Sequence, residues 1–191
     1  MKVLSVRQFL DKMEEKGHLV YTAENRPYNL NIIGIRNILG RPNHYDDTIS
    51  VYYRRRSEWI SEHFAATTRP GLPSLLKPEN PKGAAILAAG QYVGAYHIGL
   101  HKGKYPALVQ SEPVKVFRDN NKDQMFNKVN PEVGLFGINI HRASFYSRVV
   151  GQDSAGCQVI KNGNDYEDFM DLCFEARKYW GNNFTYTLLE I

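Results

Sequence analysis

The chain has 191 residues, of which 42% are hydrophobic and 12% aromatic, so its length suits one well-buried core and its composition excludes a disordered chain. The 24 Lys and Arg exceed the 20 Asp and Glu by only four. The densest basic run, Arg54, Arg55 and Arg56, is typical of a solvated strand end, so the charge pattern does not indicate a nucleic-acid-binding protein.

The first predicted element is a short amphipathic helix, in which Val6, Phe9, Leu10 and Met13 recur at helical spacing. This segment has no sustained apolar run and no small-residue cleavage site, so it does not resemble a secretory signal. No stretch approaches the about 20 apolar residues that span a bilayer. We therefore expect a protein made in the cytoplasm without a signal peptide or a membrane span.

Short runs rich in Ile, Val, Tyr and Phe follow, separated by Gly, Pro, Asn and Asp clusters, as in a many-stranded β domain. The predicted strands cover 30–36, 47–55, 83–92, 105–110, 113–119 and 135–142. The segment 68–83 holds four prolines and two glycines, which predicts a long surface loop, and loops of this length are often functional.

A second helix is predicted over 164–180, followed by a closing strand over 184–191. Asn164 or Asp165 can cap the helix, and Cys173 belongs to its apolar stripe, which makes this cysteine a core residue. The prediction is one α+β domain over 1–191, mostly β (mixed sheets or a barrel-like sandwich), with short N-terminal and C-terminal helices.

The other cysteine, Cys157, has a different setting, because it follows Ser154-Ala155-Gly156 in a turn of small residues. A thiol in such a turn can be presented to a substrate beside backbone N–H groups, which stabilise a developing oxyanion. His141 ends a predicted strand sixteen residues earlier and is a candidate base. The alternative is that the two residues are unrelated members of a β-rich fold.

The stretches "GINIHRAS" (137–144) and "SAGCQV" (154–159) resemble the signature of the L,D-transpeptidase (YkuD-type) family. The resemblance implies that Cys157 is the nucleophile, that His141 is the base, and that Ser154 and Gly156 shape the turn and help to place the oxyanion donors. It covers roughly 25 residues. Ala155 stands where the family has His or Arg, Gln158 replaces an apolar residue, and the spacer is slightly shorter. The general layout also resembles phage-encoded cell-wall-degrading proteins.

The resemblance implies a peptidase or transpeptidase that acts on peptidoglycan stem peptides through a thioester and needs no cofactor or metal. We expect hydrolysis rather than cross-linking, because a cross-linking enzyme needs export, and we expect action at the bacterial cell wall after phage-type release. Arg142, His97 and Asn139 are the expected substrate contacts, with Arg142 a candidate for a substrate carboxylate. A backbone carbonyl, Ser144 or Asp153 is expected to orient the imidazole.

Two other functions stay open. A non-catalytic module that binds wall or glycan would have no reason to lower the pKa of Cys157, so a nucleophile predicts a reactive thiol. A zinc peptidase would use His97, His101 and His141. The glycines at 99 and 103 favour a strand, on which His97 and His101 share a face. The alternating Asp119, Asn121 and Asp123 lack the Gly and Glu of a calcium loop and predict a plain turn.

Overall fold

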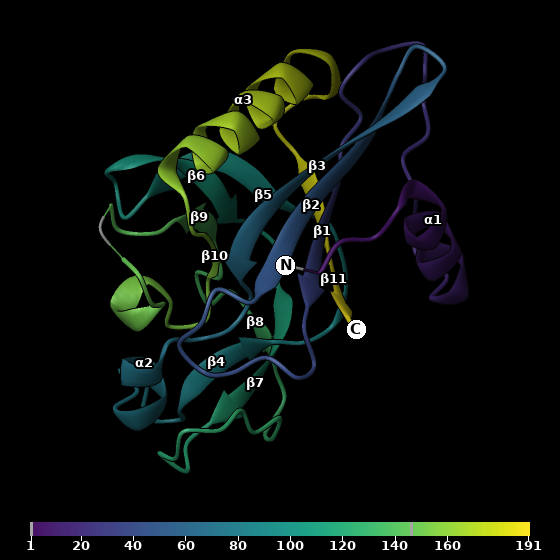
Figure 1. Cartoon of the computed structure of the whole chain (residues 1–191). Helices are drawn as coiled ribbons and strands as arrows, with labels where there is room; N and C mark the ends of the chain where they lie inside the picture. Colours follow the sequence, from purple (N-terminus) through teal and green to yellow (C-terminus); the bar gives the residue numbers. More distant parts are fainter. Residues whose placement is uncertain (1, 146) are drawn as a thin grey trace.

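The computed structural model describes residues 2–145 and 147–191, and most of its strands form a barrel. Eight strands close the barrel in the order β1-β11-β5-β6-β9-β10-β3-β2, and β4, β7 and β8 form a separate three-stranded sheet (Figure 1). The barrel strands are β1 Asn31–Arg36, β2 Asp47–Arg55, β3 Glu58–Thr67, β5 Gly90–His101, β6 Tyr105–Gln110, β9 Ile140–Arg142, β10 Gln158–Ile160 and β11 Phe184–Glu190. The small sheet consists of β4 Ala84–Leu87, β7 Val114–Asp119 and β8 Glu132–Gly134.

The helices are α1 Val6–Glu15, α2 Leu72–Leu76 and α3 Gly163–Trp180, with a short 3-10 turn, η1, over Gly151–Asp153. The predicted mostly-β α+β fold with a helix near each end of the chain is confirmed. In the described part of the chain, no helix has the length and apolar character needed to cross a membrane.

The predicted strand boundaries hold best where the apolar pattern is strong. The run 105–110 matches β6, whereas the run 83–92 contains the break between β4 and β5. β3 was not predicted, because its first six residues stay half-exposed and include Glu58, Glu62 and His63. β9 is much shorter than its predicted run over 135–142, because residues 135–139 are not paired with another strand.

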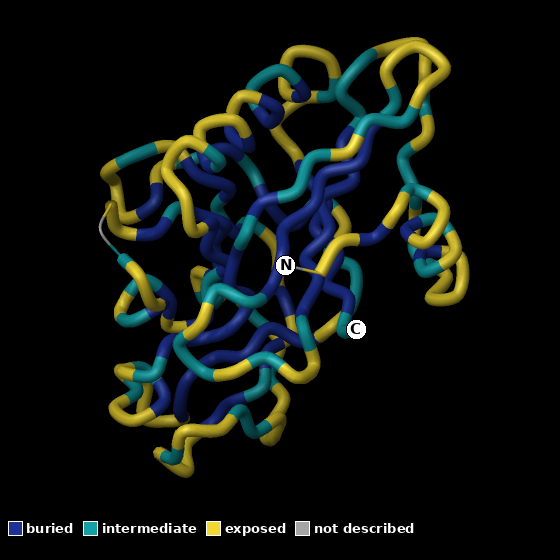
Figure 2. The backbone as a smooth tube through the Cα atoms, in the orientation of Figure 1, coloured by how far each residue is buried: buried dark blue, intermediate teal, exposed yellow. Residues whose placement is uncertain are grey.

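The core fills the barrel and continues under α3 and the small sheet (Figure 2). α3 covers one end of the barrel with Phe169, Met170 and Cys173, so the predicted core role of Cys173 is confirmed. α1 packs on the outside of β1 and β2, where its Phe9 ring stacks on Tyr52 at 4.2 Å. The small sheet lies at the opposite end from α3 (Figure 1).

The proline-rich segment 68–83 was predicted as a loop without regular structure, but five of its residues form α2. The segment follows β3 and runs beside the small sheet at the end of the barrel opposite α3 (Figure 1). Gly71 donates its N–H to the Ser154 carbonyl at 2.8 Å, and the Ser74 hydroxyl donates to the same oxygen at 3.2 Å. The segment is therefore fixed against the turn that carries Cys157.

Candidate active site

Cys157 and His141 come from two neighbouring parallel strands. β10 pairs with β9 in the register Val159 to His141, and Cys157 directly precedes β10. Cys157 is two positions before Val159, the partner of His141, so it lies on the same side of the sheet as His141. The usual rise per residue and strand spacing put the Cα atoms of Cys157 and His141 about 8 Å apart. The two side chains line one cavity of about 570 Å³.

The turn before Cys157 is held by its own side chains. The hydroxyl of Ser154, which is fully buried, accepts the Gly156 N–H at 3.1 Å and donates to the Cys157 carbonyl at 2.8 Å. Gly156 has φ +136°, and a Cβ there would lie 2.6 Å from the Ala85 carbonyl oxygen, so only glycine fits.

One backbone N–H beside the thiol is available as an oxyanion donor. Because the Gly156 N–H is bonded to the Ser154 hydroxyl, it is not available to a substrate. The Gln158 N–H donates to the Asn139 carbonyl at 2.9 Å. Among the residues that the structure describes, none accepts the Cys157 N–H, which leaves this group free for an oxyanion.

His141 is oriented by a backbone carbonyl, the first of the expected partners. Its Nδ1 lies 2.8 Å from the carbonyl oxygen of Arg142 and 3.3 Å from the Tyr105 hydroxyl. A carbonyl accepts only, so Nδ1 carries the proton and Nε2 keeps a lone pair. Ser144 instead donates to Asp153, which also accepts the Tyr45 hydroxyl at 3.1 Å.

His101 from β5 stacks on His141, with ring centroids 3.9 Å apart. The Gln110 N–H donates to Asn139 Oδ1 at 3.0 Å, which leaves the Asn139 amide Nδ2 to donate to His101 Nδ1 at 3.1 Å. His101 Nδ1 must therefore be unprotonated. Asn139, expected as a substrate contact, lines the cavity, but both its amide oxygen and its amide nitrogen are hydrogen-bonded within the protein.

The electrostatics keep both candidate catalytic groups neutral. Burial and then the adjacent His101 lower the pKa of His141 to about 4. Burial raises the pKa of the Cys157 thiol, although a hydrogen bond from the Asn139 backbone and the charge of Lys102 oppose the rise. The thiol donates to the Gly137 carbonyl at 3.3 Å. A reactive, low-pKa thiol was expected, and the resting protein has the opposite arrangement.

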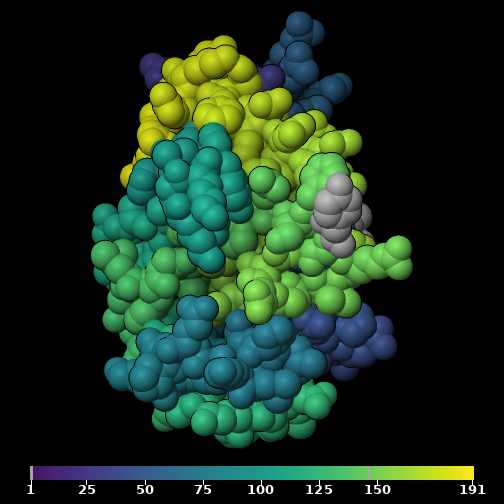
Figure 3. All heavy atoms as spheres, turned by 90° about the vertical axis from the view of Figure 1, so that its left-hand side faces the viewer, coloured from purple at the N-terminus to yellow at the C-terminus, as the bar shows by residue number. Residues whose placement is uncertain are grey.

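Cys157 stands where two cavities meet. The 570 Å³ cavity holds His101, Lys102 and His141, and a second one of about 370 Å³ extends toward the small sheet. Five residues line both cavities: Ser74, Glu79, Gly137, Ala155 and Cys157. In Figure 3 the α2 segment crosses the lower part of this face, and the green chain around β9 and β10 lies above it. The predicted functional loop thus forms one wall of the cleft.

The structure does not bring the other two expected contacts to the thiol. Arg142 packs its guanidinium 4.5 Å from the Tyr105 ring centroid and lines a neighbouring cavity with His141, but neither cavity that Cys157 lines. His97 pairs with Val109 four residues before His101 on β5 and lines neither of those cavities.

The zinc alternative finds no ligand set. His101 and His141 stack face to face, and His97 is not with them. Within residues 2–145 and 147–191, no three or more His, Cys, Asp or Glu side chains gather as metal ligands. In the segment that resembles a calcium loop, Asp119 and Asp123 accept hydrogen bonds from nearby backbone N–H groups, as expected of a plain turn.

Sequence reasoning missed several residues of the site. Tyr105 contacts the base, and Arg118 from β7 lines the second cavity. Gln158 is fully buried: its Nε2 donates to the Gly156 carbonyl at 3.1 Å, and its Oε1 accepts the Tyr186 hydroxyl at 3.0 Å. Gln158, which replaces the apolar residue of the family pattern, therefore holds the turn in place by hydrogen bonds from inside the barrel.

The structure is a closed β-barrel in which Cys157 and His141 line one cleft beside the adjacent strands β9 and β10. Comparisons with family models, with curated proteins and with solved structures find no match for this chain. The likeness to the L,D-transpeptidase family therefore rests on the two motifs within 137–159.

Proposed function

We propose that the chain is a cysteine-dependent peptidase of L,D-transpeptidase type, which acts on peptidoglycan stem peptides and releases its acyl group mainly to water. One observation carries the proposal: Cys157, directly before β10, and His141, on the adjacent parallel strand β9, line the same cleft. The free Cys157 N–H beside the thiol supports it.

In the proposed reaction, His141 Nε2 takes the thiol proton as the Cys157 sulfur attacks the peptide carbonyl. The carbonyl oxygen becomes an oxyanion and accepts the Cys157 N–H. The C–N bond then breaks, the amine leaves with the proton from His141, and a thioester remains. Water, deprotonated by His141, attacks the thioester, so the acid is released and the thiol is restored. An amine in place of water gives a cross-link.

The test is incubation with purified stem tetrapeptides and pentapeptides, followed by mass spectrometry of both protein and peptides. We expect a shorter peptide, and in a rapid quench a protein heavier by the acyl group. Cys157→Ala should abolish both signals and change the free energy of unfolding by less than about 1 kcal/mol, because little packing is lost at this partly buried turn. Added amine acceptor separates hydrolysis from transfer. Cleavage by Cys157→Ala would refute the proposal.

A second function, a non-catalytic module that binds the cell wall, is favoured by one observation. The thiol is bonded to the Gly137 carbonyl rather than to His141, and its pKa is raised. A binding module predicts equal sedimentation with purified peptidoglycan for the native protein and Cys157→Ala, with no peptide released by either.

A further inference from the structure

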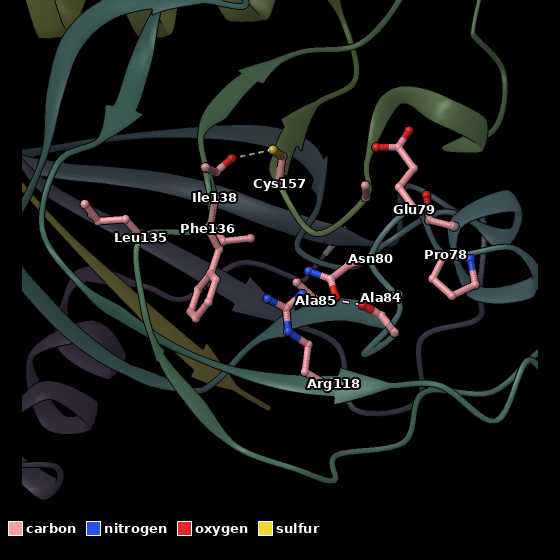
Figure 4. Close-up of a pocket in the computed structure, with 14 residues that line it drawn as sticks. Pro78, Glu79, Asn80, Ala84, Ala85, Arg118, Leu135, Phe136, Ile138 and Cys157 are labelled. Carbon is pink, nitrogen blue, oxygen red and sulfur yellow. Dashed lines mark hydrogen bonds between the residues drawn. The ribbon is translucent and has the colours of Figure 1, made fainter.

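Arg118 is a buried cation with unused donors in the cavity that Cys157 lines. Its side chain is only about 7% exposed. Nε donates to Glu132 at 2.9 Å and Nη1 to the Gly83 carbonyl at 3.4 Å, while Nη2 donates to no residue of the described chain. In Figure 4 the side chain rises from the small sheet toward the turn that carries Cys157.

Arg118 shares its carboxylate partner with a second cation. The Glu132 carboxylate forms ion pairs with both Arg118 and the Lys82 ammonium group, the latter at 2.5 Å between Nζ and Oε1. These three groups together carry a net charge of +1. Glu79 also lines the cavity, but no ion pair joins it to Arg118 in the described chain. The planar guanidinium offers the remaining N–H groups in a geometry that suits a carboxylate.

The size of the cavity limits where such a carboxylate lies. A volume of about 370 Å³ corresponds to a sphere about 9 Å across, and each residue of an extended peptide spans about 3.5 Å. A carboxylate one or two residues from the attacked carbonyl therefore reaches Arg118 while Cys157 contacts that carbonyl.

We infer that Arg118 holds a substrate carboxylate one or two residues away from the bond that Cys157 attacks, the role that the sequence suggested for Arg142. The substrate class is thus an acidic peptide or a peptide with a free carboxyl end. The inference rests on the proposed function for its substrate, but the anion site itself is measurable without any cleavage.

The experiment measures the charge that a reagent meets at the Cys157 thiol. In a Cys173→Ala background, Cys157 reacts with sulfonatoethyl methanethiosulfonate, an anion, or with the trimethylammonioethyl reagent, a cation of the same length. Each gives a mixed disulfide and methanesulfinate. A unit charge about 9 Å away, the width of the cavity, changes each rate about twofold, in opposite directions, even at the dielectric constant of water, so Arg118→Gln should lower the anion-to-cation rate ratio about fivefold. Low ionic strength keeps the effect unscreened.

The matched control is Arg142→Gln, which removes the same charge from an arginine that lines neither Cys157 cavity, so its ratio should fall by a clearly smaller factor. Glu132→Gln removes the counter-charge of Arg118 and should raise the ratio, which tests the inference even if Arg118→Gln fails to fold. An unchanged ratio in folded Arg118→Gln, an equal fall in Arg142→Gln, or a fall in Glu132→Gln would overturn the inference.

This result is independent of catalysis. A fall of about fivefold in the ratio, in a protein that cleaves no stem peptide, would support the anion site and refute the proposed function. Cleavage of stem peptides by the native protein, with an unchanged rate ratio in Arg118→Gln, would support the proposed function and refute the anion site. Where cleavage occurs, amidation of the peptide carboxylate should lower kcat/KM for the native protein and leave it unchanged for Arg118→Gln.

Discussion

The turn that carries Cys157 should be intolerant of a single added methyl group. In Gly156→Ala the new Cβ would lie 2.6 Å from the Ala85 carbonyl oxygen and 3.0 Å from the Ala85 side chain. The φ of +136° adds about 1–3 kcal/mol of backbone strain, and overpacking a filled site costs a similar amount. We expect the free energy of unfolding to fall by about 3 kcal/mol, which lowers Tm by about 6–12 °C.

The matched control is Gly163→Ala at the start of α3. Here an added Cβ meets nothing within 4 Å and the φ is not in the left-handed region, so we expect a gain of about 0.5–1 kcal/mol. Urea unfolding gives both values, and the alkylation rate of Cys157 reports whether the turn has moved. If Gly156→Ala is as stable as Gly163→Ala and its thiol reacts at the native rate, the turn is not packed against Ala85 as described.

Three further outcomes follow from the site. The pKa of His141 lies near 4 in the folded protein and near 6.5 in the unfolded chain, so the unfolded chain binds the proton more readily. About 3 kcal/mol of the stability that is present above pH 6.5 should therefore be lost as the pH falls from 6.5 through 4. Denaturant unfolding should show a shallower acid loss in His141→Gln, and parallel curves would contradict this. Tyr186→Phe leaves Gln158 Oε1 without its donor and should cost about 1–3 kcal/mol, whereas Tyr96→Phe removes a buried hydroxyl that has no partner among the described residues and should be neutral or stabilising; equal losses would contradict the assignment. Alkylation of Cys157 should still accelerate with pH beyond the ordinary thiol pKa of about 8.5, and fast labelling at pH 6 would contradict the raised pKa.

The sequence predicted those features that depend on neighbours along the chain. The mostly apolar run 105–110 became β6, and the stripe around Cys173 became the buried face of α3. The motif around Cys157 was also visible, because its turn and its strand are built from residues close in sequence. Closure of the barrel was not visible, since it depends on β11 lying parallel to β1 across some 150 residues.

The cleft depended even more on distant pairing. Arg118 looked like an ordinary charged residue at a strand end, and only the packing of the small sheet beneath the barrel brings it to the cavity of Cys157. The sequence instead predicted Arg142 as the carboxylate ligand, because it follows His141 directly. In the structure Arg142 packs on Tyr105 and shares a neighbouring cavity with His141, but it lines neither cavity of Cys157.

The neutral state of the free site limits how the proposed enzyme works. An ordinary thiol pKa of about 8.5 already lies more than four units above the value near 4 for His141, so moving the proton costs at least about 6 kcal/mol before the two charges attract each other. A rate of about 10 s⁻¹ corresponds to a barrier of about 16 kcal/mol, so this cost is compatible with catalysis but not with a preformed ion pair. Proton transfer to His141 therefore accompanies or immediately precedes the attack, and the Cys157 N–H stabilises the oxyanion as it forms. Weak alkylation of the free protein therefore does not argue against a nucleophile, and the thioester in the presence of peptide is the decisive observation.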